Sequence, residues 1–378
     1  MGELVLAGAG HAHMLLMEAI PDIIADGHRV TVIGPDDCHY YSGMGPGMLG
    51  GSYYPDEISF PVKSMVESRG GDFVLGKVVR IDPHKRLVIL EAGQEIPYDV
   101  LSCNLGSFVP SGLMGEDCTD VYTVKPIQNL FQARIRIQEI SSERPVRIGI
   151  CGGGPAALEV AGNAWAAAKE QSCLGAKVQI FTGSTFLRKF PDSVRNLALK
   201  NLTKRGIEIV QGSYVERVAT GGITLQNKQH YEQDIIFMAL GVKPSKVFAA
   251  SDMLIGKDGG LMVNSYLQSI SHPEIFGGGD CIWFEPKPLD KVGVYAVRQN
   301  PVLVHNVRAQ LEGNSLNEFN PGGSYLLIFN TGGGKGILQK YGLSFGGAPA
   351  FWIKDYIDNK FIERFNKNVS APSIPDIL

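Results

Sequence analysis

The chain has 378 residues, of which 44% are hydrophobic and 46 are glycine, and its formal net charge is -3. This length suits roughly two or three domains, and the composition is typical of a globular α/β protein with many tight turns. The small net charge and the lack of a dense basic run predict that nucleic acid is not a partner. The 6 cysteines are scattered without CxxC spacing, so we expect neither a metal site nor a secreted disulfide framework.

The predicted location is the cytoplasm. A strand pattern begins almost at Met1, which leaves no space for the charged start of a signal peptide. No apolar run reaches the roughly 18 residues that a membrane-spanning helix needs.

The first patterned segment is Leu4–Ala7, a short apolar run typical of a buried parallel strand. It leads through a glycine turn into a helix pattern, and the residues of this turn are Gly8, Ala9, Gly10, His11, Ala12 and His13. Glycines at such a strand-to-helix turn let the backbone approach a pyrophosphate, and the N–H groups that begin the helix face its charge. His13 stands where glycine or alanine is usual in this fingerprint.

The same pattern occurs again roughly 145 residues further on. Arg147–Cys151 is a second strand pattern, followed by the turn Gly152–Ala157 and an alanine-rich helix pattern. Two turns of this kind in one chain predict an oxidoreductase that binds two nucleotides.

Both units lack the acid that often ends the next strand and binds a ribose hydroxyl. The strand expected at His28–Ile33 ends at Gly34, and Asp36 is the nearest substitute, although an acid that only forms the turn is the alternative. The strand expected at Lys177–Phe181 ends at Thr182, with the cations Arg188 and Lys189 close behind. An arginine near this position accommodates the 2′-phosphate of NADPH, so the second unit favours NADPH or shows no strong preference.

Other segments complete the predicted order of elements. Tyr40–Gly47 is an aromatic, glycine-rich loop that could lie against a flat ring or simply cover the sheet. Phe73–Ile81 and Arg86–Glu91 are expected to form a hairpin, and Val292–Leu311 a long helix. The last helix carries Ile353, Ile357, Phe361 and Phe365 at i, i+4 spacing, which is typical of a core or homodimer face, with an interfacial membrane contact as the alternative.

Four landmarks occur in a fixed order: Gly8–His13, Asn104–Ser107, Gly152–Glu159 and Phe276–Asp280. In this order they resemble the FAD-dependent pyridine nucleotide-disulfide oxidoreductases. Within that superfamily the chain is similar to the branch of type II NADH dehydrogenases and sulfide:quinone oxidoreductases. It resembles most the flavoprotein domain fused ahead of some selenide, water dikinases, through Gly10–His13, Tyr41–Gly47, Tyr295–Pro301 and Trp352–Asp358.

The resemblance implies an α/β fold with two Rossmann-like dinucleotide-binding domains plus a small C-terminal segment. The domains would have the three-layer ββα architecture of glutathione reductase. The implied FAD-binding domain is discontinuous, at residues 1–117 and 260–320. The NAD(P)-binding domain would comprise residues 118–259, and the C-terminal interface segment residues 321–378. FAD is the implied cofactor and NAD(P)H the implied co-substrate.

The same resemblance assigns roles to residues. The first turn would hold the FAD pyrophosphate, Val78 would contact the adenine through its backbone, and Asp280 would accept a hydrogen bond from the ribityl chain. The helix near Tyr295 would point its N-terminus at the flavin, which favours negative charge on the reduced ring. The cofactor-binding residues implied in this way are Gly8, Ala9, Gly10, His11, Ala12, His13, Asp36, Gly45, Val78, Asn104, Leu105, Gly106, Gly279, Asp280 and Tyr295 for FAD, and Gly153, Gly154, Glu159 and Gly241 for the nicotinamide nucleotide.

The acceptor is expected to be quinone-like. Type II NADH dehydrogenases guard the quinone with two glutamines four residues apart, and the matching positions here are Tyr295 and Gln299. Together with Pro46 beside the flavin ring, these are the predicted catalytic residues. For His11 and His13 we expect a structural or phosphate-contacting role rather than a catalytic one.

Two other functions stay open at this stage. One is a flavoprotein that oxidises a sulfur or selenium compound, like a sulfide:quinone oxidoreductase. The chain lacks the CxxxxC pair of disulfide reductases, and its last cysteine, Cys281, directly follows Asp280 and is poorly placed for the role of the C-terminal cysteine of sulfide:quinone oxidoreductases, which disfavours thiol mechanisms. The other is a non-catalytic flavin-binding regulatory module, because both strand-end acids are missing. At most a peripheral contact with a membrane is expected.

Overall fold

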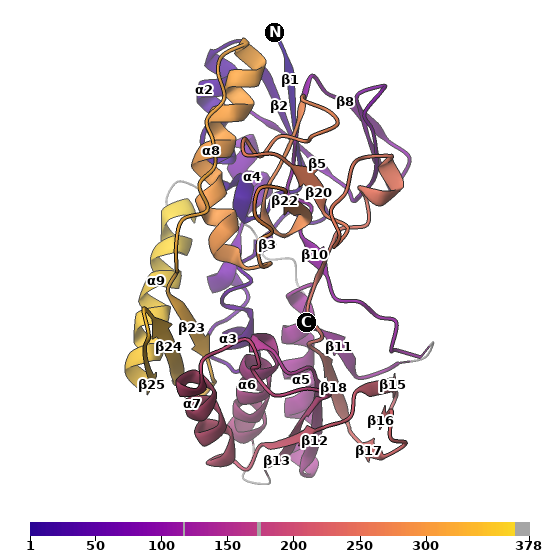
Figure 1. Ribbon diagram of the computed structural model, residues 1–378, viewed down its shortest axis with the longest axis vertical. Helices are drawn as coiled ribbons and strands as arrows, with labels where there is room; N and C mark the ends of the chain where they lie inside the picture. The colour runs from indigo at the N-terminus through magenta and orange to yellow at the C-terminus, as the bar shows by residue number, and fades with distance from the viewer. Residues whose placement is uncertain (116–117, 172–174, 367–378) are drawn as a thin grey trace.

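The computed structural model describes residues 1–115, 118–171 and 175–366. Its first sheet is parallel and has the strand order β21-β9-β1-β2-β5 (Figure 1). The strands are β1 (Glu3–Ala7), β2 (Arg29–Gly34), β5 (Asp72–Leu75), β9 (Val100–Cys103) and β21 (Ile275–Gly277). In the register, Leu4 faces Val30 and Val100, and Leu101 faces Ile275. The chain therefore leaves this sheet after β9 and returns to it at β21.

Helices cover one face of the first sheet and a small second sheet covers the other (Figure 1). The helical layer is made of η1 (His11–His13), α1 (Met14–Glu18), α2 (Ile20–Ala25), α4 (Val62–Glu67) and α8 (Gly293–Glu312). The second sheet is the antiparallel meander β6 (Val78–Asp82), β7 (Leu87–Leu90) and β8 (Glu95–Pro97). The predicted strand Phe73–Ile81 is wrong as a single strand, since β5 joins the parallel sheet and only β6 forms the hairpin.

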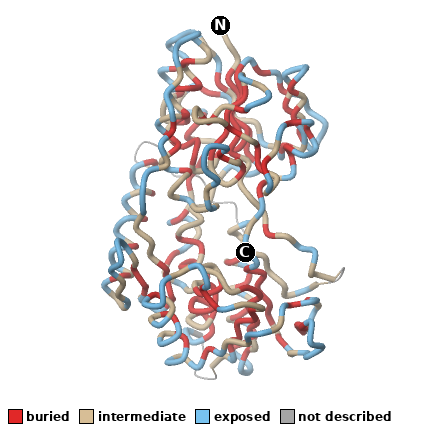
Figure 2. Tube along the Cα trace, viewed as in Figure 1, coloured by how far each residue is buried: buried red, intermediate tan, exposed pale blue. Residues whose placement is uncertain are grey.

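The second unit repeats this plan. Its parallel sheet has the order β11-β18-β12-β13-β14, and Ile148 of β12 faces Val178 of β13 and Ile235 of β18. The strands are β11 (Val121–Thr123), β12 (Val146–Cys151), β13 (Ala176–Thr182), β14 (Glu208–Gln211) and β18 (Ile235–Met238). Beside it lie α5 (Gln128–Glu143), α6 (Pro155–Gln171), α7 (Asp192–Thr203) and the meander β15 (Val215–Ala219), β16 (Gly222–Leu225) and β17 (His230–Glu232). Buried residues concentrate in both parallel sheets (Figure 2).

Short elements connect the two units. Ser107–Phe108 (β10) pairs antiparallel with Lys243–Pro244 (β19), so the outgoing and returning connections lie side by side. The remaining short elements are β3 (His39–Tyr40), α3 (Gly45–Leu49), η2 (Asp56–Ile58), β4 (Ser59–Phe60), η3 (Ala249–Ser251), β20 (Leu261–Val263), η4 (Gly279–Cys281) and β22 (Ile282–Phe284). The two Rossmann-like units confirm the predicted fold class, while the predicted domain boundaries stay a prediction.

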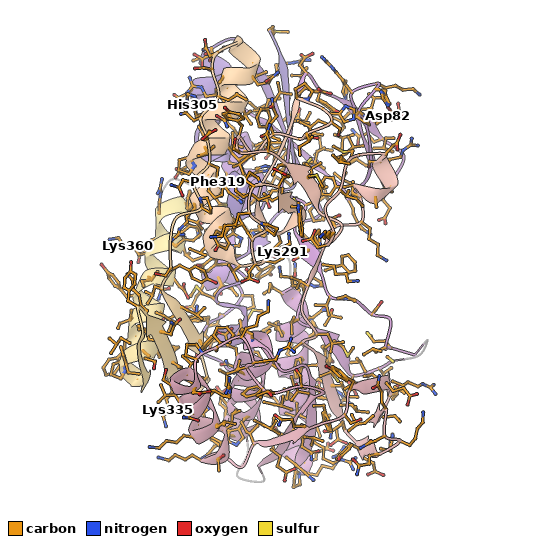
Figure 3. The ribbon with its side chains drawn as sticks, in the orientation of Figure 1. Asp82, Lys291, His305, Phe319, Lys335 and Lys360 are labelled. Carbon is orange, nitrogen blue, oxygen red and sulfur yellow. The ribbon has the colours of Figure 1, made fainter. Side chains whose placement is uncertain are left out.

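The C-terminal segment touches both units. It consists of β23 (Leu327–Asn330), β24 (Gly336–Lys340), β25 (Leu343–Gly347) and α9 (Ala348–Asn366); β23 packs on α6 and α9 packs on β4. Lys360 lies on the outer side of α9 (Figure 3).

The predicted apolar stripe of this helix is partly wrong. Ile353 and Ile357 are 38% and 42% exposed, whereas the inward face carries Ala350, Lys354, Asp358, Ile362 and Phe365. The physical reason is that α9 packs charged groups, and not only apolar ones, against the rest of the chain. No helix within the described ranges is long and apolar enough to cross a membrane.

Candidate functional site

The first glycine turn is built around Asn104. Gly8 has a left-handed φ of +94°, and a Cβ there would overlap the Asn104 carbonyl oxygen. A Cβ on Gly10 would lie 2.8 Å from Asn104 Nδ2, and one on Gly279 would lie 2.8 Å from Asn104 Oδ1. Three glycines from two distant parts of the chain thus leave room around one amide.

This cradle fits a dinucleotide pyrophosphate. The Asn104 Nδ2 donor is buried and has no hydrogen-bond partner within the described part of the protein. A buried donor without a partner costs about 1–3 kcal/mol, so a bound acceptor at this position would stabilise it. An anionic phosphate oxygen is such an acceptor. The N–H groups that begin the following helix also favour a negatively charged group at this place. Asn104 and the glycines are therefore suited to hold FAD.

A charged cluster lies at the end of the same cradle. Asp280 Oδ2 accepts hydrogen bonds from Ser107 Oγ at 2.7 Å and from Lys125 Nζ at 2.8 Å. Lys125 Nζ also donates to Ser107 Oγ at 2.8 Å. Burial alone would raise the pKa of Asp280, but Lys125 and Ser107 outweigh it and hold this pKa below its usual value. The carboxylate stays ionised and can accept a further hydrogen bond through its other oxygen.

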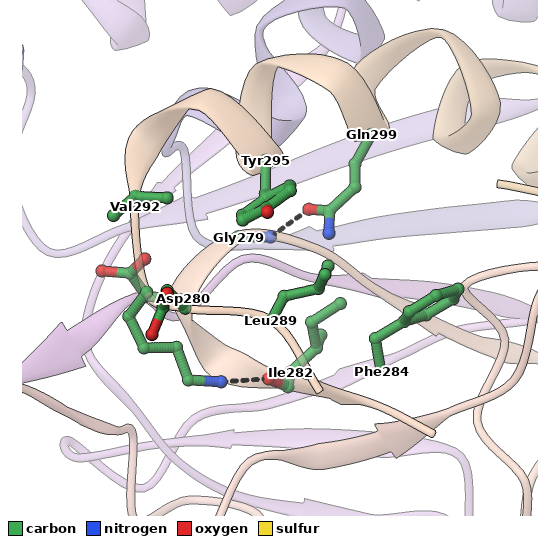
Figure 4. Close-up of a pocket in the computed structure, with 10 residues that line it drawn as sticks. Gly279, Asp280, Ile282, Phe284, Leu289, Val292, Tyr295 and Gln299 are labelled. Carbon is green, nitrogen blue, oxygen red and sulfur yellow. Dashed lines mark hydrogen bonds between the residues drawn. The ribbon is translucent and has the colours of Figure 1, made fainter. Parts of the chain in front are cut away.

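A pocket opens beside this cluster at the start of α8 (Figure 4). Tyr295 lines it and lies with its ring edge-on to Tyr325, the two centroids being 5.8 Å apart. Gln299 is 1% exposed, and its Oε1 accepts a hydrogen bond from the Gly279 N–H at 2.7 Å. The Gln299 side chain thus fixes the glycine turn before Asp280, whereas Tyr295 faces the pocket. The other lining residues are Ile282, Phe284, Leu289, Asp290, Lys291 and Val292.

The second glycine turn is tighter than the first. A Cβ on Gly152 would overlap the Ala239 carbonyl oxygen, and one on Gly153 would overlap Thr182 Oγ1. Gly154 has open space around it, at the start of α6. Gly241, with a φ of +92°, follows β18 on the same edge of the sheet. The carboxyl ends of β12, β13 and β18 therefore meet around a turn that fits a second dinucleotide.

Glu159 lies one turn into α6, deep in the molecule but with part of its surface accessible. Its Oε1 accepts a hydrogen bond from the Asn330 N–H at 2.8 Å. Burial raises the pKa of Glu159 to about 7, although the nearby Lys354 ammonium and the Asn330 N–H oppose this shift. A carboxyl group with this pKa can bind or release a proton near neutral pH.

The inward charges of α9 reach the Tyr41–Gly43 loop, which leads into α3 at Gly45 and Pro46. Lys354 Nζ donates to the Gly43 carbonyl oxygen at 2.9 Å and to Asp358 Oδ2 at 2.6 Å. Tyr41 donates its hydroxyl to the other Asp358 oxygen at 3.3 Å. Together with Glu159, these groups form a polar cluster between α6, α9 and the Tyr41–Gly43 loop.

The two histidines of the first turn differ in role. His13 is fully buried, and its Nδ1 and Nε2 lie 2.6 Å from the Gly8 carbonyl oxygen and 2.8 Å from Ser102 Oγ. Both ring nitrogens thus bond within the protein, which agrees with the structural role expected for this histidine, and a contact of His13 with the cofactor stays a prediction. His11 packs in an aromatic group with His39, Tyr41 and Phe361. Its Nε2 has no partner among the described residues.

The remaining predicted residues take these places. Ala9 and Ala12 are buried in the first turn, and Gly106 has a φ of +64° next to Leu105. Val78 begins β6 and is 7% exposed. Asp36 lies on the exposed loop after β2, where it accepts a 3.3 Å hydrogen bond from Gln128. Their contacts with a cofactor stay predictions.

Lys125, Lys354 and Tyr41 were missed as functional residues by the sequence reasoning. Lys125 lies in the turn between β11 and α5, far from any glycine motif, so nothing in its neighbours indicates a partner 155 positions away. Three of the described cysteines, Cys103, Cys151 and Cys281, are buried, and burial raises the pKa of each, so these thiols add no second site. No cluster of three or more metal-ligating side chains occurs in the described ranges.

Two Rossmann-like units, each with a glycine turn that fits a dinucleotide, are the architecture of the family that the comparisons show. The family model of the pyridine nucleotide-disulphide oxidoreductases matches residues 2–310, and the chain belongs to this family. It is an oxidoreductase of the NADH dehydrogenase-like kind, and its family implies FAD and NAD(P)H.

Two groups of relatives show how far the likeness extends. The chain is 25% identical over 390 residues to the type II NADH:quinone oxidoreductase of Staphylococcus saprophyticus, covering 95% of both chains. It is 28% identical over 303 residues to ferroptosis suppressor protein 1 of Xenopus laevis, covering 75% of this chain and 77% of that protein.

Solved structures share the fold. The sulfide:quinone oxidoreductase of Aquifex aeolicus superposes with a TM-score of 0.79 at 17% identity, covering 99% of this chain and 93% of the other. NDH2 of Plasmodium falciparum, solved with NADH, gives a TM-score of 0.78 at 14% identity, covering 99% and 100%.

Proposed function

We propose that this protein oxidises NAD(P)H and passes the two electrons, through bound FAD, to a small quinone-like acceptor. The net reaction consumes one proton: NAD(P)H, a proton and a quinone give NAD(P)⁺ and a quinol. When bound, FAD would supply the redox chemistry that links the two half-reactions. The residues of the chain would bind the two nucleotides, orient the acceptor and supply the proton.

One observation carries this proposal. Gly8, Gly10 and Gly279 leave space around Asn104, whose buried Nδ2 has no partner within the described ranges. A second, separate glycine turn meets Thr182 and Ala239 at the edge of the other sheet. Two such sites in one chain support hydride exchange between two nucleotides better than the function of a single-ligand binding module.

Glu159 is our candidate for the group that supplies the proton. Its pKa of about 7 lies close to neutral pH, and a general acid works best when its pKa is near the operating pH. Lys354 would help to orient a carbonyl oxygen of the acceptor, because its ammonium bonds to the Gly43 carbonyl oxygen just before Gly45 and Pro46 begin α3. Glu159 would therefore act on the acceptor or hold water that does so.

Tyr295 is our candidate for orienting the acceptor in the pocket at the start of α8. It lines the pocket at the start of α8, and its hydroxyl can donate a hydrogen bond to a quinone oxygen (Figure 4). The Staphylococcus relative is named for its quinone acceptor, which supports a quinone here. The finer likeness to the flavoprotein domain fused to selenide, water dikinases stays part of this proposal, as does a peripheral contact with a membrane.

Oxidation of a sulfur compound by a thiol mechanism is less well supported. Of the described cysteines, only Cys38 and Cys118 are even partly accessible, and burial beside acids raises the pKa of Cys38. A thiolate is needed for nucleophilic sulfur chemistry, and a raised pKa reduces its fraction.

The test is anaerobic reoxidation of the reduced, FAD-loaded protein by a soluble short-chain quinone in a stopped-flow instrument. We expect the flavin absorbance to return, and Tyr295→Trp to slow this return about tenfold, which is about 1.4 kcal/mol. Tyr341→Trp is the matched control, because Tyr341 is 78% exposed on the turn between β24 and β25. If the quinone restores no absorbance in the wild-type protein, the acceptor is of another chemical class and the proposal fails at this step.

A further inference from the structure

The carboxyl end of β13 has no acid and no space for one. Thr182 is 5% exposed, donates its hydroxyl to the Ser184 carbonyl oxygen at 2.9 Å and packs directly on Gly153. From Thr182 to Phe190 the sequence contains no Asp or Glu. A carboxylate that would bond both ribose hydroxyls of NADH, and repel a phosphate, is therefore missing here.

The loop after β13 brings cations to this strand end. Leu187 is 1% exposed, and its N–H donates to the Gly153 carbonyl oxygen at 2.8 Å. This bond fixes the loop beside the second glycine turn, so Arg188 and Lys189 follow immediately at its edge, and both are exposed. Lys189 lies 3.4 Å from Asp290, with both side chains mostly in solvent, whereas Arg188 forms no ion pair within the described ranges.

Tyr214 adds a flat surface at the same place. It lies between β14 and β15, and a Cβ on Gly183 would overlap its ring, so the ring covers the backbone just beyond Thr182. Tyr214 is nevertheless 57% exposed. An aromatic ring that the protein covers on one side and leaves open elsewhere is suited to stack on a nucleobase.

We propose that Arg188 and Lys189, with Tyr214, form a site for an adenosine 2′-phosphate, so that the chain prefers NADPH to NADH. The guanidinium of Arg188 would bind the phosphate, since a planar, permanently charged fork matches phosphate oxygens. Tyr214 would stack on the adenine of either nucleotide. This inference rests on the proposed function, and it would separate the chain from the Staphylococcus relative, which is named for NADH.

The experiment uses half-cofactors that bind but cannot reduce a flavin. Binding of adenosine 2′,5′-bisphosphate, adenosine 3′,5′-bisphosphate and 5′-AMP to the FAD-loaded full chain is measured by titration calorimetry at fixed salt. We expect the 2′,5′-bisphosphate to bind at least about tenfold more tightly than 5′-AMP and the 3′,5′ isomer, because a hydrogen bond between charged partners is stronger than one between neutral groups.

Variants assign this preference to residues. Arg188→Gln is expected to remove most of the tenfold ratio while leaving 5′-AMP binding unchanged. Tyr214→Ala should weaken the 2′,5′-bisphosphate and 5′-AMP by similar factors. Lys177→Gln is the matched control, since Lys177 is an exposed cation at the opposite end of β13 and should change nothing.

Several results would overturn the inference. The first is a ratio near one between the affinities for the 2′,5′-bisphosphate and for 5′-AMP. The others are equal binding of the two bisphosphates, no binding of any half-cofactor, and an affinity ratio that Arg188→Gln leaves intact. Failure of the proposed function has a different signature: the half-cofactors bind as expected, but neither NADPH nor NADH reduces the flavin. Efficient reduction by NADH together with a ratio near one would overturn only the NADPH assignment.

Discussion

The ammonium of Lys125 lies 2.8 Å from Asp280 Oδ2, although the two residues are 155 positions apart and belong to opposite units. Asp280 follows β21 of the first sheet, and Lys125 follows β11 of the second. Ser107, at the connection between the units, bonds to both. A positive charge from the second unit is thus held at the end of the glycine cradle in the first unit, which fits FAD.

We therefore predict that Lys125 makes the bound flavin easier to reduce. A nearby positive charge stabilises the negative charge of a reduced flavin more than the neutral oxidised ring. Lys125→Met should lower the midpoint potential by about 30 mV, which corresponds to about 1.4 kcal/mol for a two-electron couple. The measurement is equilibrium reduction against a reference dye. Lys125→Arg, which keeps the charge, should stay near the wild-type potential. Equal potentials in the Lys125→Met variant and the wild-type protein would show that this charge does not act on the flavin.

The second prediction concerns FAD retention. Asn104→Asp keeps the side-chain shape but replaces the free Nδ2 donor with an acceptor that repels a phosphate. We expect FAD to dissociate at least about tenfold more readily, because a hydrogen bond to a charged group contributes about 1.5–3 kcal/mol. Flavin released on dilution is measured by fluorescence. Asn314→Asp, in an exposed position after α8, is the control, and equal retention in both variants would remove Asn104 from the site.

The third prediction uses the raised pKa of Glu159. An unfolded glutamate releases its proton near pH 4.3, whereas Glu159 keeps its proton until about pH 7. Its contribution to stability is therefore fully present below the unfolded pKa and is lost as the pH rises through about 7. The loss is at most about 4 kcal/mol, at about 1.4 kcal/mol for each pKa unit between the unfolded and the folded value.

Urea unfolding at about pH 5 and about pH 8 tests this. Glu159→Gln should remove this part of the pH dependence, and Glu363→Gln, in an exposed position on α9, should leave it unchanged. An unaltered pH slope in Glu159→Gln would mean that this carboxyl is ionised throughout the range.

The fourth prediction is that turnover needs no thiol. Single replacements of Cys38, Cys118, Cys151 and Cys281 by serine or alanine should leave the rate of flavin reduction within about a factor of two. Burial raises the pKa of Cys151 to about 12 and of Cys281 to about 11, so neither is a thiolate at neutral pH. A loss of more than about tenfold, or about 1.4 kcal/mol, in a folded variant would restore the sulfur alternative. Rapid-reaction absorbance measures the rate.

Local patterns were sufficient to predict the central strands of the two parallel sheets, but not the edge strands β5, β11 and β14. The apolar runs at Leu4–Ala7 and Arg147–Cys151, each followed by glycines, form β1 and β12 as expected, because a buried parallel strand needs little beyond apolar residues and a turn. The missing acid at Gly34 also has a packing reason: a Cβ there would lie 2.9 Å from the Phe73 ring. This neighbour comes from β5 and leaves no trace in the local sequence.

The polar part of the site could not be predicted in this way. Glu159 obtains its raised pKa and its Asn330 partner from the C-terminal segment, which contacts α6 only in the folded chain. Lys354 and Asp358 occupy helical positions that a hydropathy pattern assigns to solvent, yet both are buried. Long-range pairs of charged residues depend on the arrangement of the two units and not on the spacing within either one.

The central claim is that electrons pass from a nicotinamide nucleotide to FAD in this chain, and an anaerobic titration tests it most directly. The FAD-loaded protein is titrated with NADPH and, separately, with NADH, while the flavin absorbance at about 450 nm is recorded. We predict full bleaching at about one equivalent of NADPH per flavin, with Asp280→Ala losing the response in proportion to lost FAD. A protein that holds FAD but keeps its full absorbance with excess of both nucleotides would contradict the account.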